Sequence, residues 1–310
     1  MDWTIDEVPD LSGRTAVVTG ANVGLGRETA RILAARGATV ILACRDVAKG
    51  GAAAASIAAG SNADRGRLRV VRLDLASLAS VRAAADEIRA SCPRLDLLIN
   101  NAGVMAIPFA RSADGFELTF AVNHLGHFAL TGLLLEPLLA SPGSRVVTVS
   151  SVAHRRGRCD LETLESDEGY KQGRAYDRSK LANLLFAYEL QRRLNEAGVE
   201  TISLAAHPGI ARTELWRTSS RLERVLLAPQ LRPVTFWLAQ SAEAGALPTL
   251  RAALDPDAQG GEYFGPGGWA EYTGRPVRVE SSPSSHDRSA QRRVWQTSEE
   301  LSGISYPGAR

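Results

Sequence analysis

Short stretches of apolar, often β-branched residues alternate along the chain with longer stretches rich in Ala, Leu and Arg. The first apolar stretch, at residues 15–19, is followed by a helix-like pattern at 27–36 and a second apolar stretch at 39–42. This order is typical of βαβ units, in which helices connect the parallel strands of one sheet. The same alternation predicts further strands at residues 68–73, 95–99, 145–149 and 201–204, and a short edge strand at 262–264.

Several of these predicted strands are apolar without alternation, as expected where helices cover both faces of a sheet. The sequence therefore predicts an α/β fold with one doubly wound parallel sheet of about seven strands and helices on both faces, in a single domain. We expect residues 1–280 to form this domain. A Ser-rich spacer and a helix at about 288–301, within residues 281–310, should pack on it.

Two segments depart from the alternation. Residues 153–175 change from basic to acidic and are expected to form a surface excursion. Residues 211–238 mix large apolar side chains with basic ones, and two prolines interrupt any long helix there.

Charge and cysteine content narrow the class of protein. Lys plus Arg number 36 against 34 Asp plus Glu, and a net charge of +2 argues against a nucleic acid or an anionic membrane as partner. Cys44, Cys92 and Cys159 show no paired spacing, and His124 and His127 have no third ligand nearby, so neither a disulfide framework nor a metal site is expected. With no export signal and no span-length apolar run, we expect a cytoplasmic protein without a membrane span.

A glycine-rich turn, Gly20-Ala21-Asn22-Val23-Gly24-Leu25-Gly26, follows the first predicted strand. Glycine lets the backbone approach a pyrophosphate closely, and the N-terminus of the following helix favours negative charge. The turn therefore indicates a dinucleotide-binding site. An ordinary strand-to-helix turn remains the alternative for this motif alone.

Tyr176 and Lys180 stand four residues apart at the start of a long helical pattern, which puts both on one helix face. Lowering the pKa of a phenol from about 10 by about three units requires about 4 kcal/mol. An ammonium about 4 Å away supplies roughly that amount at an effective dielectric constant of about 20. We therefore expect Lys180 to make Tyr176 acidic enough for general acid–base catalysis, with a helix-surface pair as the alternative.

Several motifs occur together over about residues 11–305: Thr19 with the glycine turn, Asn100-Asn101-Ala102-Gly103, Tyr176-x-x-x-Lys180 and Pro208-Gly209-x-x-x-Thr213. In this combination the chain resembles the short-chain dehydrogenases/reductases. Its sequence at residues 43–46, 122–128 and 179–183 is similar to that of the retinol dehydrogenase-like branch, to which the protochlorophyllide reductases are related. The resemblance implies a Rossmann-like fold and an NAD(P)-dependent oxidoreductase that acts on CH–OH or C=O groups.

The resemblance also implies which residues hold the dinucleotide. Asp74, with Leu75, would contact the adenine, and Thr213 with the neighbouring backbone would hold the nicotinamide half. The full expected set is Gly20, Asn22, Val23, Gly24, Leu25, Gly26, Arg45, Asp74, Leu75, Asn101, Ala102, Gly103, Tyr176, Lys180, Pro208, Gly209 and Thr213.

The dinucleotide itself is expected to be NADP(H), with NAD(H) as the alternative. By alignment with the family, the end of the second strand carries Cys44, which cannot accept hydrogen bonds from a ribose as an acidic residue would. Arg45 follows immediately, and a guanidinium can pair with a 2′-phosphate. Asp46 could instead neutralise Arg45.

The family pattern implies four catalytic residues: Asn123, Ser151, Tyr176 and Lys180. Tyr176 would be the general acid/base, Ser151 would hydrogen-bond the substrate oxygen, and Asn123 would hold a water that links the lysine to solvent. The family places its substrate lid at about residues 211–238, whose apolar side chains suggest a lipophilic alcohol, aldehyde or ketone as substrate.

Three alternatives stay open at this point. The chain could reduce a carbon–carbon double bond, as in the protochlorophyllide reductases, or act as a non-catalytic NADP(H)-sensing scaffold. The helix at about 176–193 could form a homodimer contact, although burial within one chain explains the same apolar pattern.

Overall fold

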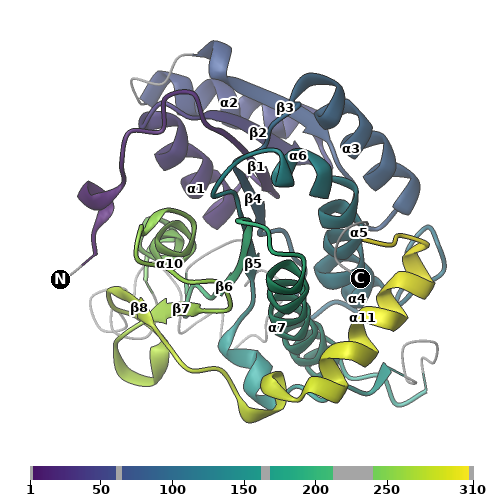
Figure 1. Cartoon of the computed structure of the whole chain (residues 1–310). Coiled ribbons are helices and arrows are strands. Elements are labelled where there is room, and N and C mark those ends of the chain that lie inside the picture. The colour runs from purple at the N-terminus through teal and green to yellow at the C-terminus, as the bar shows by residue number, and fades with distance from the viewer. Residues whose placement is uncertain (1–2, 61–64, 162–167, 212–239, 307–310) are drawn as a thin grey trace.

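The computed structural model describes residues 3–60, 65–161, 168–211 and 240–306 (Figure 1). Its centre is an eight-stranded sheet with the order β3-β2-β1-β4-β5-β6-β7-β8, parallel throughout except for β8. The strands are β1 (Thr15–Thr19), β2 (Thr39–Cys44), β3 (Leu68–Arg72), β4 (Leu97–Asn100), β5 (Arg145–Val149), β6 (Ile202–Ala206), β7 (Tyr263–Pro266) and β8 (Pro276–Arg278). The predicted doubly wound α/β fold is confirmed.

Helices cover both faces of the sheet, as the unbroken apolar strands predict. They are α1 (Gly24–Ala35), α2 (Val47–Gly60), α3 (Leu78–Ser91), α4 (Leu118–Phe120), α5 (Gly126–Leu133), α6 (Leu135–Leu139), α7 (Gln172–Glu196), α10 (Ala242–Leu254) and α11 (Arg288–Ser302). Short 3₁₀ turns lie at η1 (Ile5–Glu7), η2 (Arg65–Arg67), η4 (Val152–Arg156), η8 (Trp269–Glu271) and η9 (Pro283–His286), and η3 (Ala121–Leu125) is a π-helical turn.

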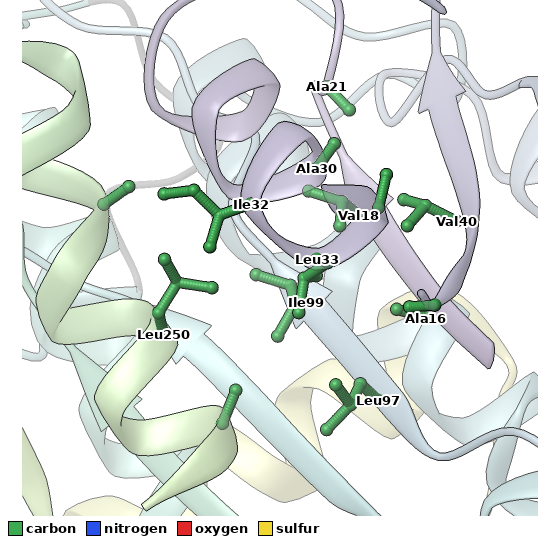
Figure 2. Packing of buried hydrophobic residues seen from close by; sticks show 14 of the residues in the cluster. Ala16, Val18, Ala21, Ala30, Ile32, Leu33, Val40, Leu97, Ile99 and Leu250 are labelled. Carbon is green, nitrogen blue, oxygen red and sulfur yellow. The ribbon is translucent and has the colours of Figure 1, made fainter. Parts of the chain in front are cut away.

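Two apolar clusters separate the layers. One holds Ala16 and Val18 of β1 against α1, α2 and α10, and the other holds Val17 of the same strand against α3, α5 and α7. Figure 2 shows the first cluster, where Ile32 and Leu33 of α1 lie over the sheet beside Leu250 of α10. Because neighbouring residues of β1 point into different clusters, the three central positions, Ala16, Val17 and Val18, are all apolar.

The sheet has one strand more than the sequence predicts. The segment expected at the edge, residues 262–264, overlaps the start of β7 at Tyr263 and Phe264, and the three-residue strand β8 pairs with β7 in antiparallel fashion. A strand this short carries no alternation that could be recognised in a sequence. Its pairing is decided by the turn between Gly267 and Arg275, whose backbone closes with a Gly267 N–H bond to Arg275 O of 2.8 Å.

Helix α11 packs along α7 as a further layer (Figure 1). The apolar residues of α7 that suggested either a dimer contact or burial within one chain, including Leu181, Leu185 and Leu190, are buried by the chain itself. Its pattern is thus accounted for by internal packing. No helix among the described residues combines the length and apolar character needed to cross a membrane.

Candidate active site

A cavity of about 440 Å³ opens at the carboxyl ends of the parallel strands, beside the neighbouring strands β1 and β4, between which the strand order reverses direction. Ligands of open α/β sheets bind at this kind of switch point. Most of the residues expected to hold a dinucleotide line this cavity: Gly20, Asn22, Val23, Gly24, Leu25, Gly26, Arg45, Asn101, Ala102, Gly103, Tyr176, Lys180 and Pro208.

The glycine turn brings the start of α1 to one wall of the cavity. Gly20 and Gly24 have φ angles of 67° and 56°, in the region that favours glycine. A Cβ atom on Gly26 would lie 2.5 Å from Asn101 Nδ2 and 2.6 Å from Gly20 O, so only glycine fits there. No side chain caps the first turn of α1, which leaves its positive end directed at the cavity. The turn therefore fits a pyrophosphate.

Arg45 stands exposed just beyond β2 and lines the cavity. The neighbouring Asp46 bonds to Lys49 instead. Its carboxylate accepts a 3.0 Å bond from the Lys49 backbone N–H and forms an ion pair with the Lys49 side chain at 3.7 Å. Cys44, at the end of β2, is buried, and burial raises the pKa of its thiol to about 11. The edge of the cavity at β2 thus presents a guanidinium and no carboxylate.

Asp74 and Leu75 follow β3 outside the residues that line the cavity. The Asp74 carboxylate accepts a 3.0 Å bond from the Ala76 backbone N–H, and the Asp74 N–H donates to Ser80 Oγ at 3.0 Å. Leu75 is buried, and its carbonyl lies close to Gly126. The Asp74 carboxylate therefore stabilises the turn that follows β3.

Tyr176 and Lys180 lie on the first turns of α7 and reach the cavity together. The Lys180 ammonium lies 5.7 Å from the centre of the Tyr176 ring and donates a 3.0 Å bond to Val149 O at the end of β5. Val149 O also accepts a 3.1 Å bond from Asn183 Nδ2. The bond to a backbone carbonyl of β5 thus fixes the lysine ammonium beside the Tyr176 ring.

In the chain without a dinucleotide, burial opposes the effect that we expect the ammonium to have on the phenol. Burial raises the pKa of Tyr176 to about 12, with a hydrogen bond from Ser151 acting in the opposite direction. Burial also lowers the pKa of Lys180 to about 8. Sequence spacing places the two groups on one face but does not include this loss of hydration, which disfavours both charged forms.

Ser150 and Ser151 follow β5 and have different surroundings. Ser150 donates a 2.8 Å bond to Lys180 O and lines the cavity, whereas Ser151 neighbours the Tyr176 phenol. Ser151 Oγ also accepts a 3.2 Å bond from the Ala153 N–H, which caps η4.

Asn123 lies fully buried in the π-helical turn η3, outside the lining of the cavity. Its Oδ1 accepts a 2.7 Å bond from Val104 N, and its Nδ2 donates to Val104 O and Ser179 Oγ, both at 2.9 Å. A Cβ atom on Gly103 would lie 3.2 Å from Asn123 Oδ1 and 3.6 Å from Lys180 Nζ, so both side chains border this glycine. π-Helical turns are frequent at functional sites.

The turn after β6 closes the far side of the cavity. Gly209 has a φ angle of 61°, and a Cβ atom there would lie 2.2 Å from Tyr272 O. The Ile210 N–H donates to the same carbonyl at 2.8 Å. Thr213 and residues 212–238 of the expected lid lie outside the described residues.

His127 is a residue whose role the sequence did not reveal beyond packing and hydrogen bonding. Its Nδ1 lies 3.1 Å from Asn123 O, which can only accept, so the Nδ1–H donates and Nε2 accepts a 2.9 Å bond from the Thr19 hydroxyl. Thr19 Oγ1 in turn accepts the Asn101 and Ala102 N–H bonds, both at 2.9 Å. This chain of bonds connects the glycine turn to η3, and only the strand order brings its members together.

Comparisons with known proteins agree with this geometry. A family model described as short chain dehydrogenase matches residues 14–223. Retinol dehydrogenase 12 of Homo sapiens is 45% identical over 294 residues, which cover 95% of this chain and 88% of the relative. Retinol dehydrogenase 14 of Mus musculus is 43% identical over 305 residues, covering 95% and 87%.

Solved structures give the same result. The crystal structure of an uncharacterised protein from Mycobacterium paratuberculosis has a TM-score of 0.81 at 43% identity, covering 99% of this chain and 100% of that one. The NADP active-site complex of RhlG from Pseudomonas aeruginosa has a TM-score of 0.63 at 26% identity, covering 82% and 94%.

Proposed function

The chain belongs to the short-chain dehydrogenase family, and from that premise we propose that it interconverts a lipophilic carbonyl compound and its alcohol with NADP(H). As a member of the retinol dehydrogenase-like branch, it is an NAD(P)-dependent oxidoreductase that acts on alcohol or carbonyl groups. One observation carries the proposal further: Tyr176 and Lys180 open into the same cavity as the glycine turn.

The preference for NADP(H) is supported by the charges at the end of β2. Arg45 borders the cavity, while the neighbouring Asp46 is engaged by Lys49. A guanidinium there can pair with a ribose 2′-phosphate, whereas discrimination for NAD(H) calls for a carboxylate. The bound dinucleotide supplies or accepts the hydride.

The proposed proton donor in the reducing direction is Tyr176. With a pKa of about 12, its phenol is protonated at neutral pH and can give its proton to a carbonyl oxygen. Ser151, beside the phenol, would hydrogen-bond that oxygen and orient it. Lys180 would hold positive charge next to the phenolate that remains, and Asn123 would support the water that returns a proton.

Alcohol oxidation places the opposite demand on the phenol, because Tyr176 must then accept a proton. Burial works against its ionised form, so a positive charge in the cavity must lower the pKa before the phenol can act as a base.

A lipophilic substrate is supported by the apolar wall that follows β4, where Val104, Met105 and Ile107 line the cavity. The relatives named as retinol dehydrogenases point to the same class of compound.

The test is Tyr176→Phe, compared with Tyr188→Phe on the same helix, whose hydroxyl bonds Ser281 at 2.8 Å away from the cavity. Loss of a general acid lowers turnover by about 10²- to 10⁴-fold. We therefore expect Tyr176→Phe to lose activity on an aldehyde and ketone panel while binding NADPH normally, and Tyr188→Phe to stay active.

Near-normal turnover of Tyr176→Phe would refute the proposed role. Dinucleotide affinities measured on the unmodified protein test the proposed preference for NADP(H). Tighter binding of NADPH than of NADH is expected, and equal affinity would refute the proposed pairing of Arg45 with the 2′-phosphate. Oxidation of NADPH by an activated alkene, but by no carbonyl compound, would instead assign a double-bond reductase.

A further inference from the structure

Three chain segments that are far apart in the sequence meet beside the candidate active site. They are η4, which follows Ser151; the turn His207–Gly209, which follows β6; and the turn between β7 and β8, which contains Glu271. The Glu271 side chain contacts the other two segments, and neither the motifs nor the proposed reaction uses it.

The contact with η4 is an ion pair. Glu271 Oε1 accepts a 2.7 Å bond from Arg155 Nη2, and the same nitrogen donates to Glu280 O at 2.9 Å. Because the Ser151 hydroxyl caps η4, the position of this short helix determines where the hydroxyl lies.

The contact with the turn after β6 is made to His207, which is fully buried. His207 Nδ1 accepts a 3.2 Å bond from the Gly209 N–H, so the ring proton sits on Nε2. Nε2 lies 3.0 Å from Glu271 Oε2, so the two groups are in contact, although the two atoms are not aligned as a hydrogen bond. Burial favours the neutral carboxyl, but His207 and Arg155 outweigh it and lower the pKa of Glu271.

The backbone at this position is strained. Ala270 and Glu271 have φ angles of 49° and 58°, which residues other than glycine rarely adopt. Strain of this kind persists only where surrounding contacts over-determine it, and it clusters at functional sites. Here it directs the Glu271 carboxylate inward, between Arg155 and His207.

Gln240 connects the same turn to the segment that follows β6. Gln240 Nε2 donates to Pro208 O at 2.7 Å, Gln240 Oε1 accepts from Gly274 N at 3.3 Å, and Gln240 pairs with Ala211 in an isolated parallel bridge. The turn between β7 and β8 thus contacts both the segment that follows Ser151 and the Pro208–Gly209 turn.

We propose that Glu271 is a positioning residue for the reaction, which holds η4 and the His207–Gly209 turn at a set separation and thereby places the Ser151 hydroxyl against the nicotinamide side of the cavity. This inference rests on the proposed function. Glu271 lies outside the cavity lining, so it acts through Arg155 and His207 and not on the substrate.

Two substitutions separate position from stability. Glu271→Asp keeps the charge and tolerates the left-handed backbone better, but its shorter side chain cannot reach Arg155 and His207 together. Glu271→Gln keeps the length and removes the charge. Glu262→Gln is the matched control, since Glu262, directly before β7, forms a partly exposed ion pair with Arg278 of β8 at 2.9 Å.

Misplacement of reacting groups by about 1 Å can cost about 100-fold in rate, so we expect kcat of both Glu271 variants to fall by about 10- to 100-fold. Glu271→Asp should unfold at the same urea concentration as the parent, so that the fall in kcat is not a loss of folded protein. Glu262→Gln should keep its kcat.

Parental kcat in folded Glu271→Asp and Glu271→Gln would overturn the proposal, as would a loss of kcat matched only by a loss of folded protein. Tyr176→Phe, measured alongside, separates the two hypotheses. If it is inactive while the Glu271 variants are active, only the positioning role fails, and if it is active, the proposed function fails.

Discussion

At the scale of single residues, the site depends on buried groups whose protonation is set by their surroundings. His154 illustrates this: its Nε2 accepts a 3.0 Å bond from the Ser282 N–H, so its Nδ1–H donates to Ser151 O at 2.6 Å. A second proton on the ring would remove the bond to Ser282. Neutral histidine is therefore part of the structure that holds Ser151.

These histidines make stability depend on pH. Burial lowers the pKa of His124 and His154 from 6.5 to about 4 and that of His127 to about 3. As the pH falls below about 6.5, these histidines become protonated in the unfolded chain but stay neutral in the folded one. The free energy of unfolding therefore decreases. Three such groups give a slope of up to about 4 kcal/mol per pH unit near pH 5.

Urea unfolding between pH 7.5 and 5 measures this slope. Stability should be at its full value above pH 7 and fall steadily toward pH 5, and His127→Gln should show a slope smaller by about 1.4 kcal/mol per pH unit. A free energy of unfolding that stays constant over this range would contradict the argument.

At the scale of elements, the first strand, the glycine turn and α1 act as one unit. The turn works because Gly26 lets α1 start directly against Gly20 and Asn101, and Asn101 Nδ2 donates back to Thr19 O at 2.8 Å. The close approach joins the end of β4 to the end of β1 and exposes the start of α1 to the cavity.

Gly26→Ala should therefore weaken dinucleotide binding by about tenfold or more, since a shift of about 1.4 kcal/mol at the turn has that effect. The added Cβ would lie 2.6 Å from Gly20 O, a backbone atom that cannot move aside easily. Fluorescence titration with NADPH measures the change.

Gly51→Ala is the control for that substitution. Gly51 lies in α2 with open space around it, and alanine favours a helix by about 1 kcal/mol over glycine. This variant should bind NADPH normally and unfold at a higher temperature. If both variants bind equally well, the close approach at Gly26 is not required.

At the scale of the whole molecule, the C-terminal helix completes the core on the α7 side of the sheet. Trp295 of α11 is fully buried between Phe128 and Phe186, with ring centres 5.2 and 5.9 Å away, and the Arg193 guanidinium lies 4.3 Å above its ring. Tyr306 continues this contact with a 2.6 Å bond to Phe128 O. Helix α7, which carries Tyr176, is thus held between the sheet and α11.

Truncation of Trp295 to alanine should destabilise the protein by about 3–5 kcal/mol, the range for large aromatic residues in cores. Trp269→Ala is the matched control, because Trp269 is 70% exposed and surface substitutions change stability by about 0.5 kcal/mol at most. Urea unfolding at pH 7.5 compares the two. Equal midpoints would show that α11 does not contribute to the core.

The sequence alone determined the features that depend on neighbouring residues: the alternation of strands and helices, the glycine turn, and the placement of Tyr176 and Lys180 on one helix face. These are local because backbone preference and helix spacing act over a few residues. The family resemblance extended them to a fold and a class of reaction, and both were correct.

The tertiary structure decided what depends on contacts between distant segments. The strand β8, the bond from Lys180 to Val149 O and the contacts of Glu271 with Arg155 and His207 all join residues that no local pattern relates. The pKa of Tyr176 belongs here too, since loss of hydration depends on everything packed around the phenol. Spacing brings a lysine near a tyrosine, but only the packed protein determines how much charge either can carry.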